Sequence, residues 1–359
     1  MNILGYVKTH RQTFAQEEIT AVDYLILSWV SYFDFACVCE SFPITIEELA
    51  LNPLYNKTLR PYFECFEPRK TVALVKAMGA SERFKDIKII ANKVIYNANG
   101  TMLYASIALK IGNSIVISYK GTGFSYQGWK EDFMLSYQSE IESHRSSREF
   151  FEEIASKEEG EIVLIGHSKG GNLAVNTLFT VEDPNRIKEV YSFDGPGVGR
   201  LPVGADETQK KKVHKYIPQS SVVGMLFESE FDSRIVRSNA LFVFQHNLFS
   251  WEIRKGDFLY LKKRTVYTDN LVESLEAWID SLPGEDKEKF TFLVFGALEG
   301  LKARDFSEFG KTWLFQVAPL LRSYGKLSEE DKGVVKRVIK SLSSYIRRPK
   351  KKVKKAISE

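Results

Sequence analysis

The clearest chemical signature in the sequence is GHSKGG at 166–171, which fits the G-x-S-x-G pattern of a nucleophilic serine. The apolar run EIVLIG precedes it, and a pattern typical of a helix follows it. On so sharp a strand-to-helix turn, Gly166 and Gly170 leave room for neighbouring backbone and Ser168 is presented at the helix N-terminus, where N–H groups favour developing negative charge. We predict that Ser168 is the nucleophile of a serine hydrolase. The alternative is an idle serine in a glycine-rich turn.

Attack on an ester carbonyl also requires N–H donors for the oxyanion. The segment SIVISYKGTG (114–123) supplies a strand that ends in a turn of small residues. We assign the oxyanion donors to the backbone N–H of Thr122 and that of Lys169, the residue after the nucleophile. The alternative is that KGTG is only a turn leaving a strand.

The general base is expected to be a histidine. In α/β-hydrolases the chain order is serine, acid, histidine, and of the five histidines only His214 and His246 follow the nucleophile at a distance. His246 lies in FVFQHNLFSW, where an apolar stretch gives way to a polar loop, and we assign it as the base. His214 is assigned to a surface or strand position. His167, inside the motif, is expected to pack against the elbow or orient it.

The acid is less clearly marked. Asp194 ends the strand that follows the nucleophile helix, in SFDGPGVG, and it falls between serine and histidine as the chain order requires. It is equally suited to capping the turn that the following Gly-Pro pair creates. Asp206 and Asp232 are lesser candidates.

The flanking sequence predicts an α/β fold. Residues 17–40 show helical spacing of apolar residues, and from 86 a two-residue alternation indicates several strands in succession. A helix is predicted over 149–160, and WEIRKGDFLYLKKRTVY (251–267) is expected to be strand-like. Strands that alternate with helices imply a mainly parallel sheet with flanking helices, and ligand sites then lie at the carboxyl ends of the strands.

These elements divide the chain into three parts. We expect an α/β-hydrolase domain with N-terminal helices at 1–267, a helical C-terminal region at 268–346 and a basic tail at 347–359. The helical region is either a cap over the site or an appendage, and the sequence leaves that choice open.

Composition narrows the class of protein. Of the 359 residues, 44% are hydrophobic and 27% charged, as in globular proteins, and no apolar run reaches the roughly 18 residues of a spanning helix. The first residues lack the pattern of a secretory signal, so we expect a cytoplasmic protein. Cys37, Cys39 and Cys65 lack metal-ligand spacing and are expected to be reduced thiols. No metal or other cofactor is expected.

The C-terminal run RRPKKKVKK holds seven basic residues, whereas the rest of the chain is mildly acidic. It follows an amphipathic helical pattern, so it is a candidate contact for an anionic membrane surface, which would make the protein peripheral to the membrane. The alternative is a solvated C-terminus. Nucleic acid is not expected as a partner, because no aromatic platform accompanies the basic run.

Five segments in order resemble a bacterial family of largely uncharacterised lipase-like proteins related to the class 3 (fungal-type) lipases. They are SYKGTGFSYQGWKEDF, IGHSKGGNLA, VYSFDGPGVG, KYIPQSSVVGML and FQHNLFSW, and the resemblance runs from about residue 18 to about residue 251. It implies an α/β-hydrolase fold in which Thr122 and Lys169 bind the oxyanion, Ser168 attacks and His246 is the base.

The sequence departs from the class 3 lipases at the acid. Those lipases resemble this chain around FDGPGVG but have a glycine where Asp194 stands, and they carry their acid in a segment that here reads PQSSVVG, with Ser220 and Ser221. Either Asp194 has taken over as the acid, or a hydroxyl orients the histidine in a dyad, or the enzyme is weak or inactive.

The expected function is hydrolysis of a carboxylic ester, as in lipases and esterases, through an acyl-enzyme on Ser168, with an acyl ester or lipid as substrate. One alternative is a catalytically impaired hydrolase fold that serves as a binding or regulatory protein. Another is an acyl thioesterase or acyltransferase, which uses the same constellation of residues.

Overall fold

A nine-stranded sheet forms the centre of the computed structural model, which describes residues 1–33, 35, 41–52, 67–96, 102–123, 125–199, 201, 205–227, 231–301 and 306–347. The strand order is β1-β2-β3-β4-β5-β6-β7-β8-β11, and β9 and β10 form a separate pair. The bounds are β1 Ile44–Thr45, β2 Lys88–Tyr96, β3 Leu103–Ile111, β4 Ser114–Tyr119, β5 Ile162–His167, β6 Ile187–Phe193, β7 Val213–Pro218, β8 Ser233–Val236, β9 Ile253–Arg254, β10 Asp257–Phe258 and β11 Tyr260–Leu261.

The five central strands, β4 to β8, are parallel, and antiparallel strands extend the sheet at both edges. The alternation predicted from residue 86 onward forms the meander β2-β3-β4, which turns at Gly112 with a positive φ of 60°. The stretch 251–267 contributes only three two-residue strands, and its last two residues already belong to a helix.

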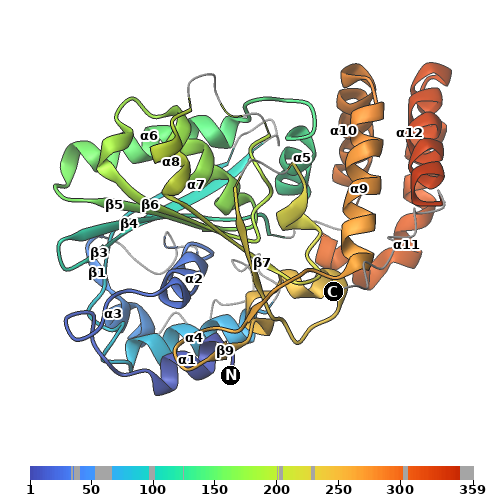
Figure 1. Ribbon diagram of the computed structural model, residues 1–359. Coiled ribbons are helices and arrows are strands. Elements are labelled where there is room, and N and C mark those ends of the chain that lie inside the picture. Colours follow the sequence, from blue (N-terminus) through green and yellow to red (C-terminus); the bar gives the residue numbers. More distant parts are fainter. Residues whose placement is uncertain are drawn as a thin grey trace, which may run out of the picture.

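Helices cover both faces of the sheet (Figure 1). One face carries α1 Ile3–Thr9, α2 Ala21–Val30, α3 Ile46–Leu51 and α4 Pro68–Gly79, and the other carries α6 Glu142–Lys157, α7 Lys169–Thr180 and α8 Glu207–Lys211. Each face has its own apolar core: Leu25 and Trp29 of α2 are buried on the first, and Leu173 and Leu178 of α7 on the second. The sheet that carries the site is therefore packed on both sides.

Two predicted helices differ from the observed ones in extent. The helix predicted over 17–40 is α2, which begins after a capping box made by Thr20 and Asp23 and ends at Val30. The helix predicted over 149–160 begins earlier, at Glu142, and ends at Lys157; the chain then turns through Gly160, whose φ is 104°. The capping box fixes the start of α2, a bound that apolar periodicity alone does not locate.

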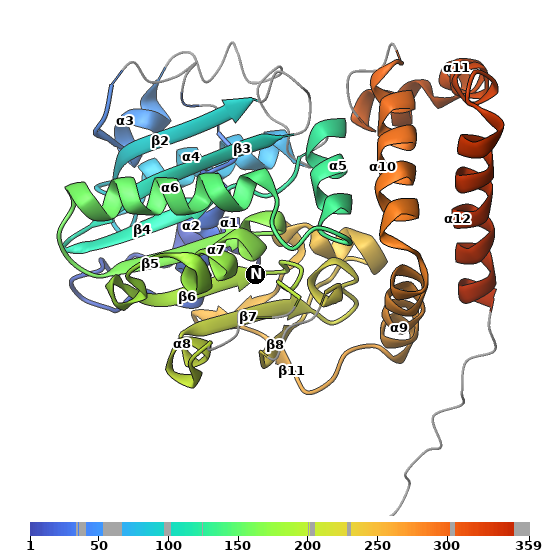
Figure 2. The same cartoon turned by 90° about the horizontal axis from the view of Figure 1, so that it is seen from above.

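The C-terminal region is helical, as predicted, and consists of α9 Val266–Ser281, α10 Gly284–Glu299, α11 Phe306–Gly325 and α12 Glu329–Arg347. Helix α10 packs against α5 (Tyr126–Met134), and α12 packs against α9 and α10 (Figures 1 and 2). Tyr126 of α5 is buried together with Phe295 and Leu298 of α10. This region is thus attached to the sheet domain beside the carboxyl ends of its parallel strands.

Within the described ranges, every helix is too short or too polar to span a bilayer. The predictions for Cys37, Cys39, Cys65 and nearly all of the basic tail concern residues that lie outside the described part of the chain.

Candidate active site

Ser168 occupies a sharp turn between β5 and α7, with a positive φ of 58°. A Cβ on Gly166 would lie 2.1 Å from the carbonyl carbon of Gly170, and a Cβ on Gly170 would lie 2.0 Å from the carbonyl oxygen of Tyr119. Both distances are far below contact, so only glycine fits at either position. A non-glycine residue at positive φ stores strain of about 1–3 kcal/mol, which is typical of functional positions.

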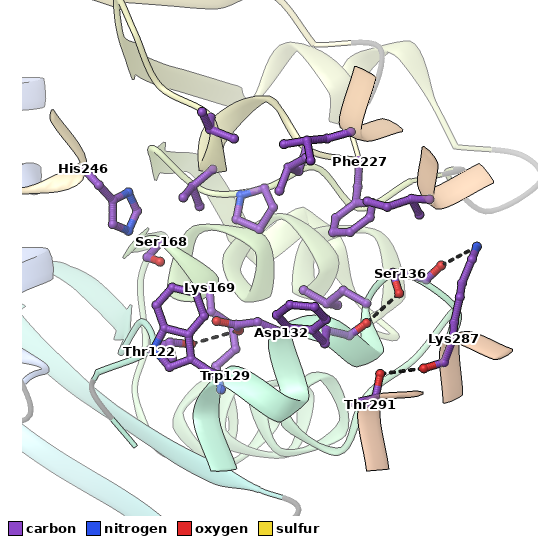
Figure 3. Close-up of a pocket in the computed structure, with 18 of the residues that line it drawn as sticks. Thr122, Trp129, Asp132, Ser136, Ser168, Lys169, Phe227, His246, Lys287 and Thr291 are labelled. Atoms are coloured by element: carbon purple, nitrogen blue, oxygen red, sulfur yellow. Dashed lines mark hydrogen bonds between the residues drawn. The ribbon is translucent and has the colours of Figure 1, made fainter. Parts of the chain in front are cut away.

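His246 ends a short 3₁₀ helix, Phe242–His246, rather than standing in a plain loop. Its Nδ1 lies 2.7 Å from Oδ2 of Asp194, and Figure 3 shows the imidazole beside Ser168, with which it lines one cavity. The structure therefore brings together the three residues assigned from the sequence as nucleophile, acid and base. Their catalytic roles remain a prediction.

Asp194 directly follows β6 and is completely buried. Its φ is positive, 51°, and its backbone N–H donates to the carbonyl of Tyr216 at 2.7 Å. The hydroxyl of Ser221 donates to Oδ1, so each carboxylate oxygen has a partner. Ser221, in the segment PQSSVVG, thus contacts Asp194, and Asp194 in turn contacts His246. This arrangement favours Asp194 as the acid over a dyad in which a hydroxyl orients the histidine.

The lesser candidates lie elsewhere. Asp206 is exposed at the N-terminus of α8, where hydrogen bonds from Thr208 lower the pKa of its carboxyl. Asp232 is exposed in the segment before β8. His214 was predicted at a surface or strand position; it lies on β7, and its Nε2 pairs with Glu189. None of the three lines the cavity.

His167 links the elbow to the segment that carries the base. Its Nε2 lies 2.8 Å from the carbonyl oxygen of His246, and its Nδ1 lies 3.1 Å from the hydroxyl of Tyr32. Burial, and then the nearby charge of His246, hold the pKa of His167 well below its ordinary value, so the ring is neutral. It therefore donates to the carbonyl of His246 and accepts from Tyr32, which fits the packing role expected from the sequence.

The two residues assigned to the oxyanion hole, Thr122 after β4 and Lys169 at the start of α7, also line the cavity. Their side chains are engaged elsewhere. The Thr122 hydroxyl donates to Asp132 at 2.9 Å, and the Lys169 amine donates to Glu131 at 2.6 Å. Because both side chains are engaged, the predicted oxyanion donors are the backbone N–H groups of these two residues.

Sequence reasoning missed both acidic residues of α5. Glu131 is buried and accepts from Lys169 and from the backbone and hydroxyl of Ser143. Burial raises the pKa of Asp132 to about 6, although the charge of Lys169 and the hydroxyl of Thr122 act in the opposite direction. The signal was present as paired carboxylates in WKEDF, directly after the oxyanion turn.

A cavity of about 650 Å³ extends from Ser168 and His246 between the sheet domain and the C-terminal helices (Figure 3). Apolar side chains dominate its lining: Trp129, Phe133, Leu135, Pro196, Val222, Val223, Leu226, Phe227, Phe244, Leu275, Trp278, Ile279, Leu282, Phe290 and Val338. The helical region that the sequence left unexplained therefore forms part of the site. Among the described residues, no cluster of metal-ligating side chains is present.

The family model described as Mbeg1-like matches residues 78–296. This chain belongs to the Mbeg1-like family. The matched range includes the elbow, Asp194, His246, α9 and most of α10, whereas α11 and α12 lie beyond it. This membership agrees with the family resemblance seen in the sequence, and the chain has the α/β-hydrolase fold that the sequence predicted.

Two solved structures are similar to this chain at low identity. A mutant form of MDLA from Penicillium cyclopium is 11% identical, with a TM-score of 0.36, over 66% of this chain and 83% of that one. Lip2 lipase from Yarrowia lipolytica is 11% identical, with a TM-score of 0.33, over 64% and 80%. No curated protein matches the chain. The site is accordingly described from its own geometry.

Proposed function

We propose that this protein is a serine ester hydrolase that cleaves a carboxylic ester through an acyl-enzyme on Ser168. The observation that carries the proposal is the 2.7 Å contact of His246 with the buried carboxylate of Asp194, next to a serine held at positive φ. A nucleophilic serine needs a base within reach and a third group that orients that base. The proposal is supported by the meeting of Ser168, His246 and Asp194 at the carboxyl ends of the parallel strands.

In the proposed mechanism, Oγ of Ser168 attacks the ester carbonyl while Nε2 of His246 takes the hydroxyl proton. The tetrahedral oxyanion is stabilised by the backbone N–H groups of Thr122 and Lys169. His246 then gives its proton to the leaving alkoxide, the C–O bond breaks and an alcohol departs. Water activated by His246 hydrolyses the acyl-enzyme and releases a carboxylic acid. Asp194 accepts a hydrogen bond from Nδ1–H of the imidazole throughout and so keeps the ring oriented.

The test is covalent labelling with a fluorophosphonate probe, paired with hydrolysis of p-nitrophenyl esters. Labelling is expected for the wild type and for the control Ser156→Ala, an exposed serine of α6, and is expected to be lost in Ser168→Ala and His246→Ala. If folded wild-type protein is neither labelled nor active on any ester, the hydrolase proposal is wrong. The binding or regulatory alternative would then stand.

The same residues also serve thioester cleavage or acyl transfer, because both proceed through an acyl-enzyme. Offering acyl thioesters as substrates and alcohols as acceptors distinguishes these reactions from ester hydrolysis. Faster turnover of the thioester, or an ester product formed in preference to free acid, would identify a thioesterase or an acyltransferase.

A further inference from the structure

The deep wall of the cavity consists of helices that do not belong to the sheet domain. Leu275, Trp278 and Ile279 line the cavity from α9, and their spacing of three and four residues places them on one face of that helix. Leu282, the residue that directly follows α9, also lines the cavity. Helix α10 adds Phe290 and helix α12 adds Val338. An entire helix face is thus turned toward the cavity that begins at the nucleophile.

This wall is fixed to its surroundings. The indole N–H of Trp278 donates to the hydroxyl of Ser341 on α12 at 2.9 Å. Val272 at the base of α9 is buried in a cluster with Ile217 of β7, and α10 is anchored to α5 through its buried aromatic contacts. A wall held at both ends presents a cavity of defined size, and such a cavity can select a ligand by length.

The position of the base decides which part of an ester enters the cavity. A general acid must reach the leaving oxygen, so the alcohol lies near His246. Figure 3 shows His246 and Ser168 at one end of the cavity and Lys287 and Thr291 at the other. The substituent on the carbonyl carbon, which is the acyl chain, therefore extends away from His246 into the apolar part.

The charged groups along this path are already engaged. Lys169 is paired with Glu131, and Asp132 accepts from a hydroxyl. At the far end, the amine of Lys287 donates to the carbonyl of Ser136 at 3.2 Å. The interior between the two ends is lined by aliphatic and aromatic side chains, which favour an apolar ligand.

We propose that the cavity binds one long, unbranched acyl chain and that α9 sets the length of chain accepted. The assignment of the chain to the acyl side rests on the proposed function, but the binding of a fatty acid does not. The volume of about 650 Å³ lies within the range of roughly 300–1,000 Å³ seen for sites that enclose most of a small ligand. The matching fatty acid would be both the product of hydrolysis and a ligand.

The first test measures fatty-acid binding without turnover. Dodecanoate and hexadecanoate are titrated calorimetrically into Ser168→Ala protein carrying either Leu275→Trp or the control Ala277→Trp. Ala277 is exposed on α9 and does not line the cavity. The substitution Leu275→Trp fills part of the cavity and is expected to weaken fatty-acid binding at least about tenfold. An apolar pocket too small by one methylene group has an effect of about this size. The control is expected to bind like its parent.

The second test uses hydrolysis in the presence of the native serine. With p-nitrophenyl esters, Leu275→Trp is expected to lower the ratio of long-chain to short-chain kcat/KM at least about tenfold, and Leu275→Ala to move the optimum to longer chains. Acetates of long-chain alcohols place the chain on the leaving group, and their kcat/KM is expected not to rise with the length of that chain. Because one substitution adds volume and the other removes it, a folding defect in either leaves the other informative.

Each outcome decides a separate point. Failure of the parent to bind either fatty acid, or equal binding by the Trp variant and its control, overturns the inference. Fatty-acid binding that depends on Leu275, without turnover of any ester, supports the chain site and refutes only the proposed function. A preference that follows the alcohol chain overturns the assignment of the cavity to the acyl side.

Discussion

Replacing Asp194 with asparagine keeps the size of the side chain and removes the charge that orients His246. The carboxylate is completely buried, and its Oδ2 lies 2.7 Å from Nδ1 of the imidazole. An amide that donates to Nδ1 forces the imidazole proton onto Nε2, the nitrogen that must accept from Ser168. In serine proteases with such a triad this change costs about 10⁴-fold in kcat, equivalent to about 5 kcal/mol. We expect a loss of this size for Asp194→Asn.

The assay is kcat for a p-nitrophenyl ester, with Asp206→Asn and Asp232→Asn as matched controls at exposed carboxylates. Thermal unfolding of each variant shows whether it is folded. A second variant with a smaller expected effect is Ser221→Ala, which removes the hydroxyl that donates to Oδ1 of Asp194. Its kcat is expected to fall roughly 10- to 100-fold, which corresponds to the loss of one hydrogen bond to a charged group. If Asp194→Asn retains about a tenth or more of the wild-type kcat, or if either control loses as much activity, Asp194 is not the acid.

Three further predictions follow from the same geometry and from the tail. In Gly224→Ala the new Cβ would lie 2.3 Å from Oδ1 of Asp194, so kcat should fall about 100-fold, whereas Gly296→Ala in α10 meets nothing within 4 Å and should leave kcat unchanged; equal kcat values would contradict this reasoning. Burial raises the pKa of Asp132 from 3.8 to about 6, so the folded carboxyl binds its proton more tightly than the unfolded one. The wild type should therefore lose unfolding free energy relative to Asp132→Asn as the pH rises from about 4 to about 6 in urea titrations, and a pH-independent difference would refute the shift. Removing 347–359 should reduce flotation with anionic liposomes, and undiminished flotation would exclude the tail as a membrane contact.

The sequence by itself was sufficient to predict the elbow and the elements around it. A nucleophile elbow is a local structure, because its turn needs glycine at fixed offsets from Ser168, and strand and helix periods are visible on either side. Chain order reduced the choice of base to two histidines, and His246 is the one that lies at the site. These inferences depend on neighbours in the chain, which a sequence shows directly.

The partner of His246 and the shape of the cavity were decided only by the tertiary structure. Asp194 and His246 are 52 residues apart in sequence, and their contact exists because β6 and the 3₁₀ helix end at the same edge of the sheet. The apolar face of α9 has the spacing of any core-facing helix, so nothing in the pattern states whether it covers a core or a cavity. Which surface a helix covers is set by the packing of distant segments, and that information is absent from local periodicity.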